Sequence, residues 1–120
     1  MKIEVSNGEI LDKLSILDLK LEYITDIDKK NNIKKEFEVV KACADNIDIP
    51  YEIYDKLHSV NKKLWEIEDA IRLKEKALVF DGEFIELARQ VYKTNDERSR
   101  IKKEINLLTN SEVIEEKSYK

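Results

Sequence analysis

The sequence predicts an all-α fold: an antiparallel helical bundle of three long helices and one short helix, joined by short turns. Charged residues make up 40% and hydrophobic residues 42% of the 120-residue chain, which holds only 2 Gly and 1 Pro. Sheet and barrel folds need many more turn residues, whereas this composition is typical of long solvated helices with one buried face. The length fits one domain. We assign it to residues 1–110, with residues 111–120 as a C-terminal tail.

The first two helices are predicted from a cap and an apolar repeat. Ser6 and Glu9 form a capping box that starts the first helix. Apolar residues then recur at gaps of four and three to about residue 28, which predicts one buried face: Ile10, Leu14, Leu17, Leu21 and Ile24. Residues 29–32 break this pattern. We therefore expect a shorter second helix over 33–44 and a linker over 45–50.

The last two helices are predicted to form a hairpin. Pro50 is tolerated in the first turn of the third helix, whose apolar residues keep near-heptad spacing to about Ala77. Asp81 is the predicted N-cap of the fourth helix, which ends near Asn110. The connection at 80–82 is so short that the two helices must be antiparallel neighbours, with the first helix packed against both.

Charge and cysteine content restrict the partners and the location. The 22 basic and 26 acidic residues are interspersed and give a net charge of −4, so we expect no nucleic-acid partner. No apolar run is long enough to cross a bilayer, and the N-terminus lacks a signal-peptide pattern. The single cysteine, Cys43, cannot form an internal disulfide. We expect a cytoplasmic protein that does not bind membranes and, given its long coiled-coil-like helices, a homo-oligomer, most simply a homodimer.

Several polar residues lie where a plain bundle would be apolar. Arg98 falls on the buried face of the fourth helix, and a desolvated guanidinium needs carboxylates and hydrogen bonds around it. We expect the third helix to supply these acids. The first helix adds Lys13 and Lys20 beside its buried face, with Glu9, Asp12 and Asp18 as their possible counter-charges. The candidate ligand-binding residues are Lys20, Asn61, Glu68, Asp69, Arg72, Asn95, Arg98 and Lys102.

Two interpretations of these residues stay open. In the first, they form a structural network of ion pairs and amides that fixes the helix register. In the second, they line a small pocket in which the cations bind an anionic ligand. A small enzyme is a further alternative, with Glu68 or Asp69 as acid or base beside Arg72 and Arg98.

Other chemistry has little support in the sequence. His58 is the only histidine, and no second soft ligand stands at a workable spacing from it or from the single thiol. With two glycines in the chain, no Gly-rich phosphate loop can form. We therefore expect no metal site and no cofactor.

A set of motifs extends along the chain. They are Val5–Glu9 with Asp12-Lys13 and Ile16-Leu17, Asn61 with Leu64–Asp69 and Ile71-Arg72, Phe84–Arg89 with Val91-Tyr92, Asn95-Asp96 and Arg98, and Lys102–Asn106 followed by Glu115–Tyr119. With these motifs the chain resembles an uncharacterised family of short proteins from bacteria and their phages. Asn110 departs from that pattern, because relatives tend to carry glycine there, and this leaves the direction of the tail open.

The resemblance implies no established activity. It implies only that members often sit among genes for surface-polysaccharide or glycosyl-transfer work. A family pattern with polar residues on three helices and an acidic tail favours a recognition surface. The sequence thus predicts a helical binding protein that recognises a partner protein or a small anionic ligand, linked to surface polysaccharide metabolism. The alternatives are a small carboxylate-dependent enzyme acting on nucleotides or sugar phosphates, and a purely structural interaction module.

Overall fold

The computed structural model describes residues 1–116. Four helices follow one another: α1 (Asn7–Tyr23), α2 (Ile27–Ala44), α3 (Tyr51–Ala77) and α4 (Gly82–Leu108). The described part of the chain contains no strand, which confirms the predicted all-α class. Within it, each helix is too short or too polar to cross a membrane. The last four residues of the predicted tail, 117–120, lie outside the described residues, and so do Lys117, Ser118 and Tyr119 of the tail motif.

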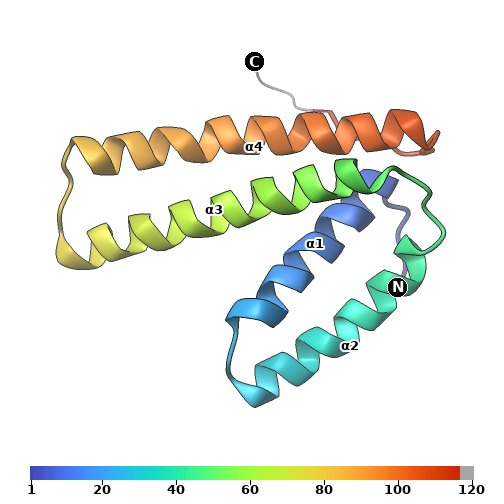
Figure 1. Ribbon diagram of the computed structural model, residues 1–120, viewed down its shortest axis with the longest axis horizontal. Coiled ribbons are helices and arrows are strands. Elements are labelled where there is room, and N and C mark those ends of the chain that lie inside the picture. The colour runs from blue at the N-terminus through green and yellow to red at the C-terminus, as the bar shows by residue number, and fades with distance from the viewer. Residues whose placement is uncertain (117–120) are drawn as a thin grey trace.

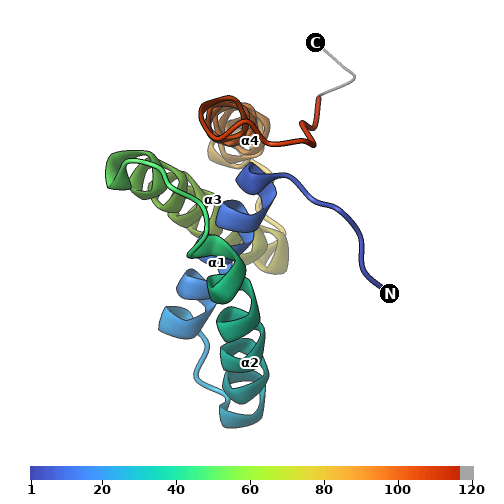
Figure 2. The same cartoon turned by 90° about the vertical axis from the view of Figure 1, so that its right-hand side faces the viewer.

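The helices form two hairpins that diverge from each other. The α3 and α4 helices, 27 residues each, run antiparallel side by side, and the 17-residue α1 and 18-residue α2 form the second hairpin (Figure 1). The α1 helix packs against all three others, and Figure 2 shows it between α2 on one side and α3 and α4 on the other. These lengths correct the expected three long helices and one short helix. The arrangement is two long and two shorter helices joined through α1.

The boundary between the first two helices differs from the prediction. Ser6 caps α1 as expected, its Oγ accepting a hydrogen bond from the Glu9 N–H at 3.1 Å. However, α1 ends at Tyr23, and Asp26 caps α2 by accepting from the Lys29 N–H at 2.9 Å. The predicted break at 29–32 therefore lies inside α2. The apolar repeat runs on through Ile24 and Ile27, so periodicity alone places the break too late.

The turn between α3 and α4 is confirmed where the sequence placed it. Asp81 caps α4, its Oδ1 accepting from the Phe84 N–H at 2.9 Å, and Lys74 Nζ lies 3.1 Å from the same carboxylate. The α3 helix ends at Ala77, and the next residue, Leu78, has a φ of 57° and a ψ of 37°, which place it in the left-handed region. This conformation is ordinarily taken by glycine.

The core lies where the two hairpins meet. Its buried side chains come from α1, α3, α4 and the end of α2: Leu11, Leu14, Ala44, Ile53, Leu57, Val60, Ile101 and Ile105. The predicted buried face of α3 is confirmed from Ile53 to Ile67, but Ile71 is only half-buried and Leu78, which was predicted to continue this face, is exposed. On α1, Leu11 and Leu19 are buried together with the predicted Leu14 and Leu17, because a helix with neighbours on several sides buries more than one stripe.

Candidate functional site

Asp12 is the centre of a buried group of polar side chains at the crossing of α1, α3 and α4. The residue is 1% exposed. Its Oδ1 accepts a hydrogen bond from Arg98 Nε at 2.8 Å, and its Oδ2 accepts from Arg98 Nη2. This forked pairing, on a guanidinium side chain that is 27% exposed, is the strong geometry for a carboxylate. The hydrogen bond to Asp12 raises the pKa of Arg98, although burial acts against it, so the guanidinium stays charged.

An amide and a hydroxyl complete the first layer around this carboxylate. Asn61 Nδ2 donates to Asp12 Oδ1 at 2.9 Å and to Ser15 Oγ at 2.7 Å. The Ser15 hydroxyl donates in turn to the Asp12 backbone carbonyl at 2.8 Å. Both residues are buried. Each buried polar atom in this layer thus has a partner from another part of the fold, as burial requires.

A second ion pair, between Lys102 and Glu9, balances the charges next to Asp12. Lys102 Nζ lies 2.7 Å from Glu9 Oε2 and 4.0 Å from Asp12 Oδ2. We call Glu9, Asp12, Ser15, Asn61, Arg98 and Lys102 the polar cluster. It contains two carboxylates and two cations, so its formal charge is zero. Its main physical effect is to hold three helices together, because removing any one charged partner would leave another without compensation.

The start of α1 is joined to the end of α4 by a second network. The Gly8 N–H donates to Asn106 Oδ1 at 2.6 Å, and the Asn7 N–H donates to Ser111 Oγ at 3.0 Å. The Ser6 hydroxyl donates to Glu115 Oε1 at 2.5 Å. We call these six residues the N-terminal anchor. The first N–H groups of α1 are therefore satisfied by the protein itself and offer no anion site.

Glu115 brings a negative charge to this helix start. Burial acts to raise the pKa of its carboxyl, but the hydrogen bond from Ser6 and the charge of Lys102 outweigh burial, and the pKa lies below its ordinary value. A carboxylate near the N-terminus of a helix is also favoured by the helix dipole. The tail over 111–116 is therefore tied to the fold by its ionised acid.

Gly8 allows α1 and α4 to approach each other closely. A Cβ atom built at this position would lie 2.5 Å from the Lys102 carbonyl oxygen and 3.0 Å from Asn106 Oδ1. Backbone atoms of a packed helix cannot rotate away from such a contact. The Ser6-Asn7-Gly8 motif therefore has a structural role, since it sets the distance between α1 and α4.

Three of the eight predicted site residues belong to the polar cluster, namely Asn61, Arg98 and Lys102. The others do not. Glu68 and Arg72 form an ion pair on the surface of α3, 3.9 Å apart with side chains 53% and 78% exposed. The other three lie outside the cluster: Asp69 is exposed, and Lys20 and Asn95 are half-buried.

The carboxylate that binds Arg98 comes from a different helix than the sequence predicted. We expected carboxylates from α3, but the bonded carboxylate is Asp12 on α1. Glu68 acts on Arg98 only through its charge at longer range. The physical reason is that α1 lies over the α3/α4 hairpin at this level, so its side chains reach the guanidinium first.

Sequence reasoning missed the roles of Gly8, Ser15, Asn106 and Thr94. For Gly8, the one signal in the sequence is that a glycine stands inside a helical pattern, which indicates that another part of the chain comes close to it. Asn106 and Ser15 give no such signal, because polar residues at those positions also fit a solvated face. Thr94 Oγ1 is buried without a hydrogen-bond partner among residues 1–116.

Comparisons with known proteins give a family without an activity. The profile of a family of unknown function (DUF6165) matches residues 1–120. No curated protein and no solved structure matches the chain. The function must therefore be argued from the geometry of the fold.

Proposed function

The chain belongs to a family of unknown function (DUF6165), and from the geometry above we propose that it is a helical docking module. It binds a partner protein through the turn between α3 and α4. We call Leu78, Val79 and Phe80 the hairpin tip. These three consecutive residues are 73%, 41% and 54% exposed. Single exposed apolar residues are common, but a contiguous group at the end of a projecting hairpin is typical of an interaction site.

The backbone of Leu78 carries the proposal. Its left-handed conformation costs roughly 1–2 kcal/mol for a residue with a Cβ, and glycine would remove that cost. The Leu78 side chain gains little in return within the chain, because it is mostly exposed. A residue that lowers local stability without packing gain is expected where the side chain serves binding.

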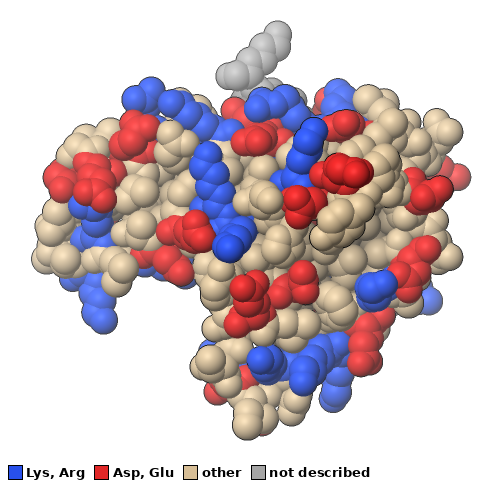
Figure 3. Space-filling view, in the orientation of Figure 1, with Lys and Arg blue, Asp and Glu red and all other residues tan. Residues whose placement is uncertain are grey.

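The charges around the hairpin tip favour a protein over a membrane. Residues 73–86 contain two lysines, Lys74 and Lys76, and four acids, Glu75, Asp81, Glu83 and Glu86, which gives a net charge of 2 − 4 = −2. Figure 3 likewise shows acidic (red) and basic (blue) side chains interspersed with other residues on the projecting hairpin. Anionic membranes attract basic segments. The complementary partner is a protein with an apolar recess and a basic rim.

The polar cluster supports the alternatives less well. Arg98 and Lys102 are already paired with Asp12 and Glu9, so an anionic ligand would have to compete with buried carboxylates. Glu68, the proposed acid or base of an enzyme, is paired with Arg72 on the surface. A link to surface polysaccharides depends on the family resemblance alone and stays a prediction.

Photo-crosslinking in cells tests the proposal. A benzophenone amino acid is placed at Phe80, and in a matched control at Lys62, an exposed position on α3 away from the tip. We expect one dominant protein adduct from position 80 that position 62 does not give. With the purified partner, Phe80→Ser should weaken the Kd at least tenfold, while Lys62→Ser should not change it. Equal adducts at both positions, or binding that Phe80→Ser leaves unchanged, would refute the role of the tip.

A further inference from the structure

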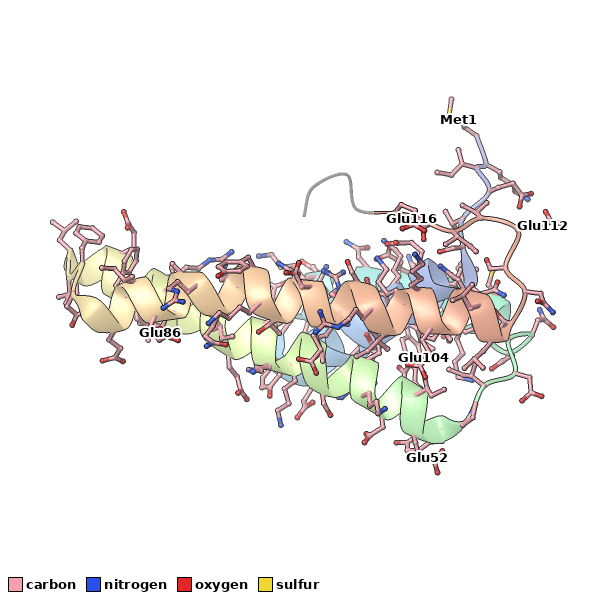
Figure 4. All side chains as sticks on the ribbon, turned by 90° about the horizontal axis from the view of Figure 1, so that it is seen from above. Met1, Glu52, Glu86, Glu104, Glu112 and Glu116 are labelled. Atoms are coloured by element: carbon pink, nitrogen blue, oxygen red, sulfur yellow. The ribbon has the colours of Figure 1, made fainter. Side chains whose placement is uncertain are left out.

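The half of the α3/α4 hairpin that carries the hairpin tip has little apolar packing to hold it in shape. Figures 1 and 4 show that this half, which contains Glu86, extends past α1 and α2. Between Ile67 on α3 and Thr94 on α4, no side chain over residues 68–93 is buried. Half-buried apolar contacts fix a turn weakly, because the energy of such a contact grows with the area removed from water. Polar contacts therefore have a larger share in fixing the shape of this free end.

Lys74 joins the two helices in this half of the hairpin. Its Nζ lies 3.1 Å from both carboxylate oxygens of Asp81 and 3.5 Å from Glu83 Oε2. Over residues 68–93, both ion pairs that link α3 to the start of α4 are made by this one side chain. The Lys74 side chain is 18% exposed, against 48% for Asp81 and 74% for Glu83. Its stem is thus packed while its ammonium group reaches the two acids.

The backbone of Lys74 holds the other side of the turn. Its carbonyl accepts a hydrogen bond from the Val79 N–H at 2.9 Å, and the Glu75 carbonyl accepts from the Leu78 N–H at 3.1 Å. These two bonds close the end of α3 around Leu78, the residue in the left-handed region. A residue with a Cβ keeps this conformation only when the contacts around it determine it. Lys74 therefore holds the chain on both sides of the hairpin tip, at Val79 and at Asp81.

We call Lys74, Asp81 and Glu83 the clamp, and its contacts continue to the aromatic residue of the tip. The Phe84 N–H and the Lys74 ammonium group both lower the pKa of Asp81, so this acid is ionised at neutral pH. Asp81 accepts the hydrogen bond from the Phe84 N–H at 2.9 Å. The Phe84 ring in turn meets Phe80 edge to face, with ring centroids 5.2 Å apart and planes at 82°, which is a favoured aromatic geometry. The clamp thus fixes the residue that positions Phe80.

We propose that Lys74 is the positioning residue of the hairpin tip: through the clamp it holds the tip in the shape that the partner protein binds. The proposal rests on the docking function above and adds what keeps the site formed before binding. An ordered site binds more tightly than a loose site with the same side chains, because less conformational entropy is lost on association. Two acids of its own chain already neutralise Lys74. It therefore acts on the partner through the shape of the tip and not through its own charge.

Amide hydrogen exchange of the free full chain tests the clamp without a partner. Lys74→Met keeps the packed stem and removes the charge, whereas Asp81→Asn removes the charge and keeps an oxygen that can cap α4. We expect each to speed the exchange of amides over 75–79 and 84–88 about threefold. The double variant should exchange no faster than Lys74→Met alone, because both changes remove one interaction, and Lys74→Arg should retain slow exchange. Lys76→Met is the matched control, since Lys76 is exposed on the same turn of α3. Unchanged exchange in Lys74→Met, or an equal change in the control, would overturn the proposal.

Binding rates test whether the clamp acts by positioning the tip. The probe is the protein isolated through its adduct at position 80. When the tip is loosened but keeps its side chains, fewer chains are competent to bind, so the association rate falls. We expect Lys74→Met to lower this rate about threefold relative to Lys76→Met, which carries the same change in charge. Phe80→Ser should instead raise the dissociation rate, and Lys74→Arg should bind like the wild type. If no adduct forms at position 80, the docking function and this role both fail. If the adduct forms and Lys74→Met associates as fast as its control, the role of Lys74 alone is rejected.

Discussion

The replacement of Gly8 by alanine is the sharpest test of how α1 and α4 meet. The added Cβ would lie 2.5 Å from the Lys102 carbonyl oxygen, and under 3.0 Å the neighbouring atoms must move. The Lys102 carbonyl belongs to the backbone of α4, so relief requires that the helices separate. Separation would also lengthen the hydrogen bond from the Gly8 N–H to Asn106 Oδ1, now 2.6 Å.

The expected loss of stability follows from three terms. Overpacking of this kind costs typically 1–3 kcal/mol, and weakening the buried hydrogen bond costs about 1 kcal/mol more. Alanine recovers at most about 1 kcal/mol through its higher helix propensity. We expect Gly8→Ala to lower the free energy of unfolding by about 2 kcal/mol, and to lower the Tm by about 8 °C for a chain of this length.

Urea unfolding followed by far-UV circular dichroism measures this change. Gly82→Ala is the matched control, since no atom lies within 4 Å of a Cβ built at Gly82. The control should match the wild type or exceed it by up to about 1 kcal/mol, because only the gain in helix propensity acts there. If Gly8→Ala and Gly82→Ala are equally stable at an unchanged m-value, the close approach of α1 to α4 is not what positions the N-terminal anchor.

Four further substitutions test other parts of the fold. Arg98→Met should lower stability by about 3 kcal/mol because it leaves the buried Asp12 carboxylate without its main partner, and an unchanged urea midpoint would reject this. Thr94→Val should raise stability by about 1 kcal/mol by removing an unpaired buried hydroxyl; a lower Tm would contradict it. Leu78→Gly should raise stability by about 1 kcal/mol through relief of its left-handed backbone, and a loss in chemical denaturation would show that the side chain packs. Because the folded pKa of Glu115 is lowered, its contribution is complete above the ordinary value of 4.5 and is lost as pH falls through the folded pKa. Glu115→Gln should therefore lower the Tm near neutral pH but not in acid, and an equal deficit at both would disprove the charge effect.

Local patterns in the sequence were enough to predict α3, α4 and the turn between them. The predicted seam of α3 is buried at Ile53, Leu57 and Leu64, because a helix with one main neighbour keeps its apolar residues on one stripe. Asp81 caps α4 as predicted, since a capping side chain acts on backbone N–H groups only three residues away. Such short-range rules do not depend on the rest of the fold.

The position of α1 could not be predicted in the same way. Its crossing over the α3/α4 hairpin depends on Gly8 meeting the Lys102 carbonyl, a contact between residues far apart in the chain. Sequence reasoning paired Arg98 with acids of the neighbouring α3, because adjacent helices in a hairpin are the simplest guess. The observed pairing with Asp12 follows only once the path of α1 is known.

The joining of the chain's two ends has a consequence for biosynthesis. The hydrogen bonds from Arg98 to Asp12 and from Ser6 to Glu115 connect positions 86 and 109 residues apart. The ribosome releases α1 and α2 before Arg98 and Glu115 emerge. The Asp12 carboxylate of the nascent chain is therefore hydrated until that point. Closing contacts of such long range slow folding. The contacts between α1 and the segment over 98–115 can therefore form only after that segment has left the ribosome.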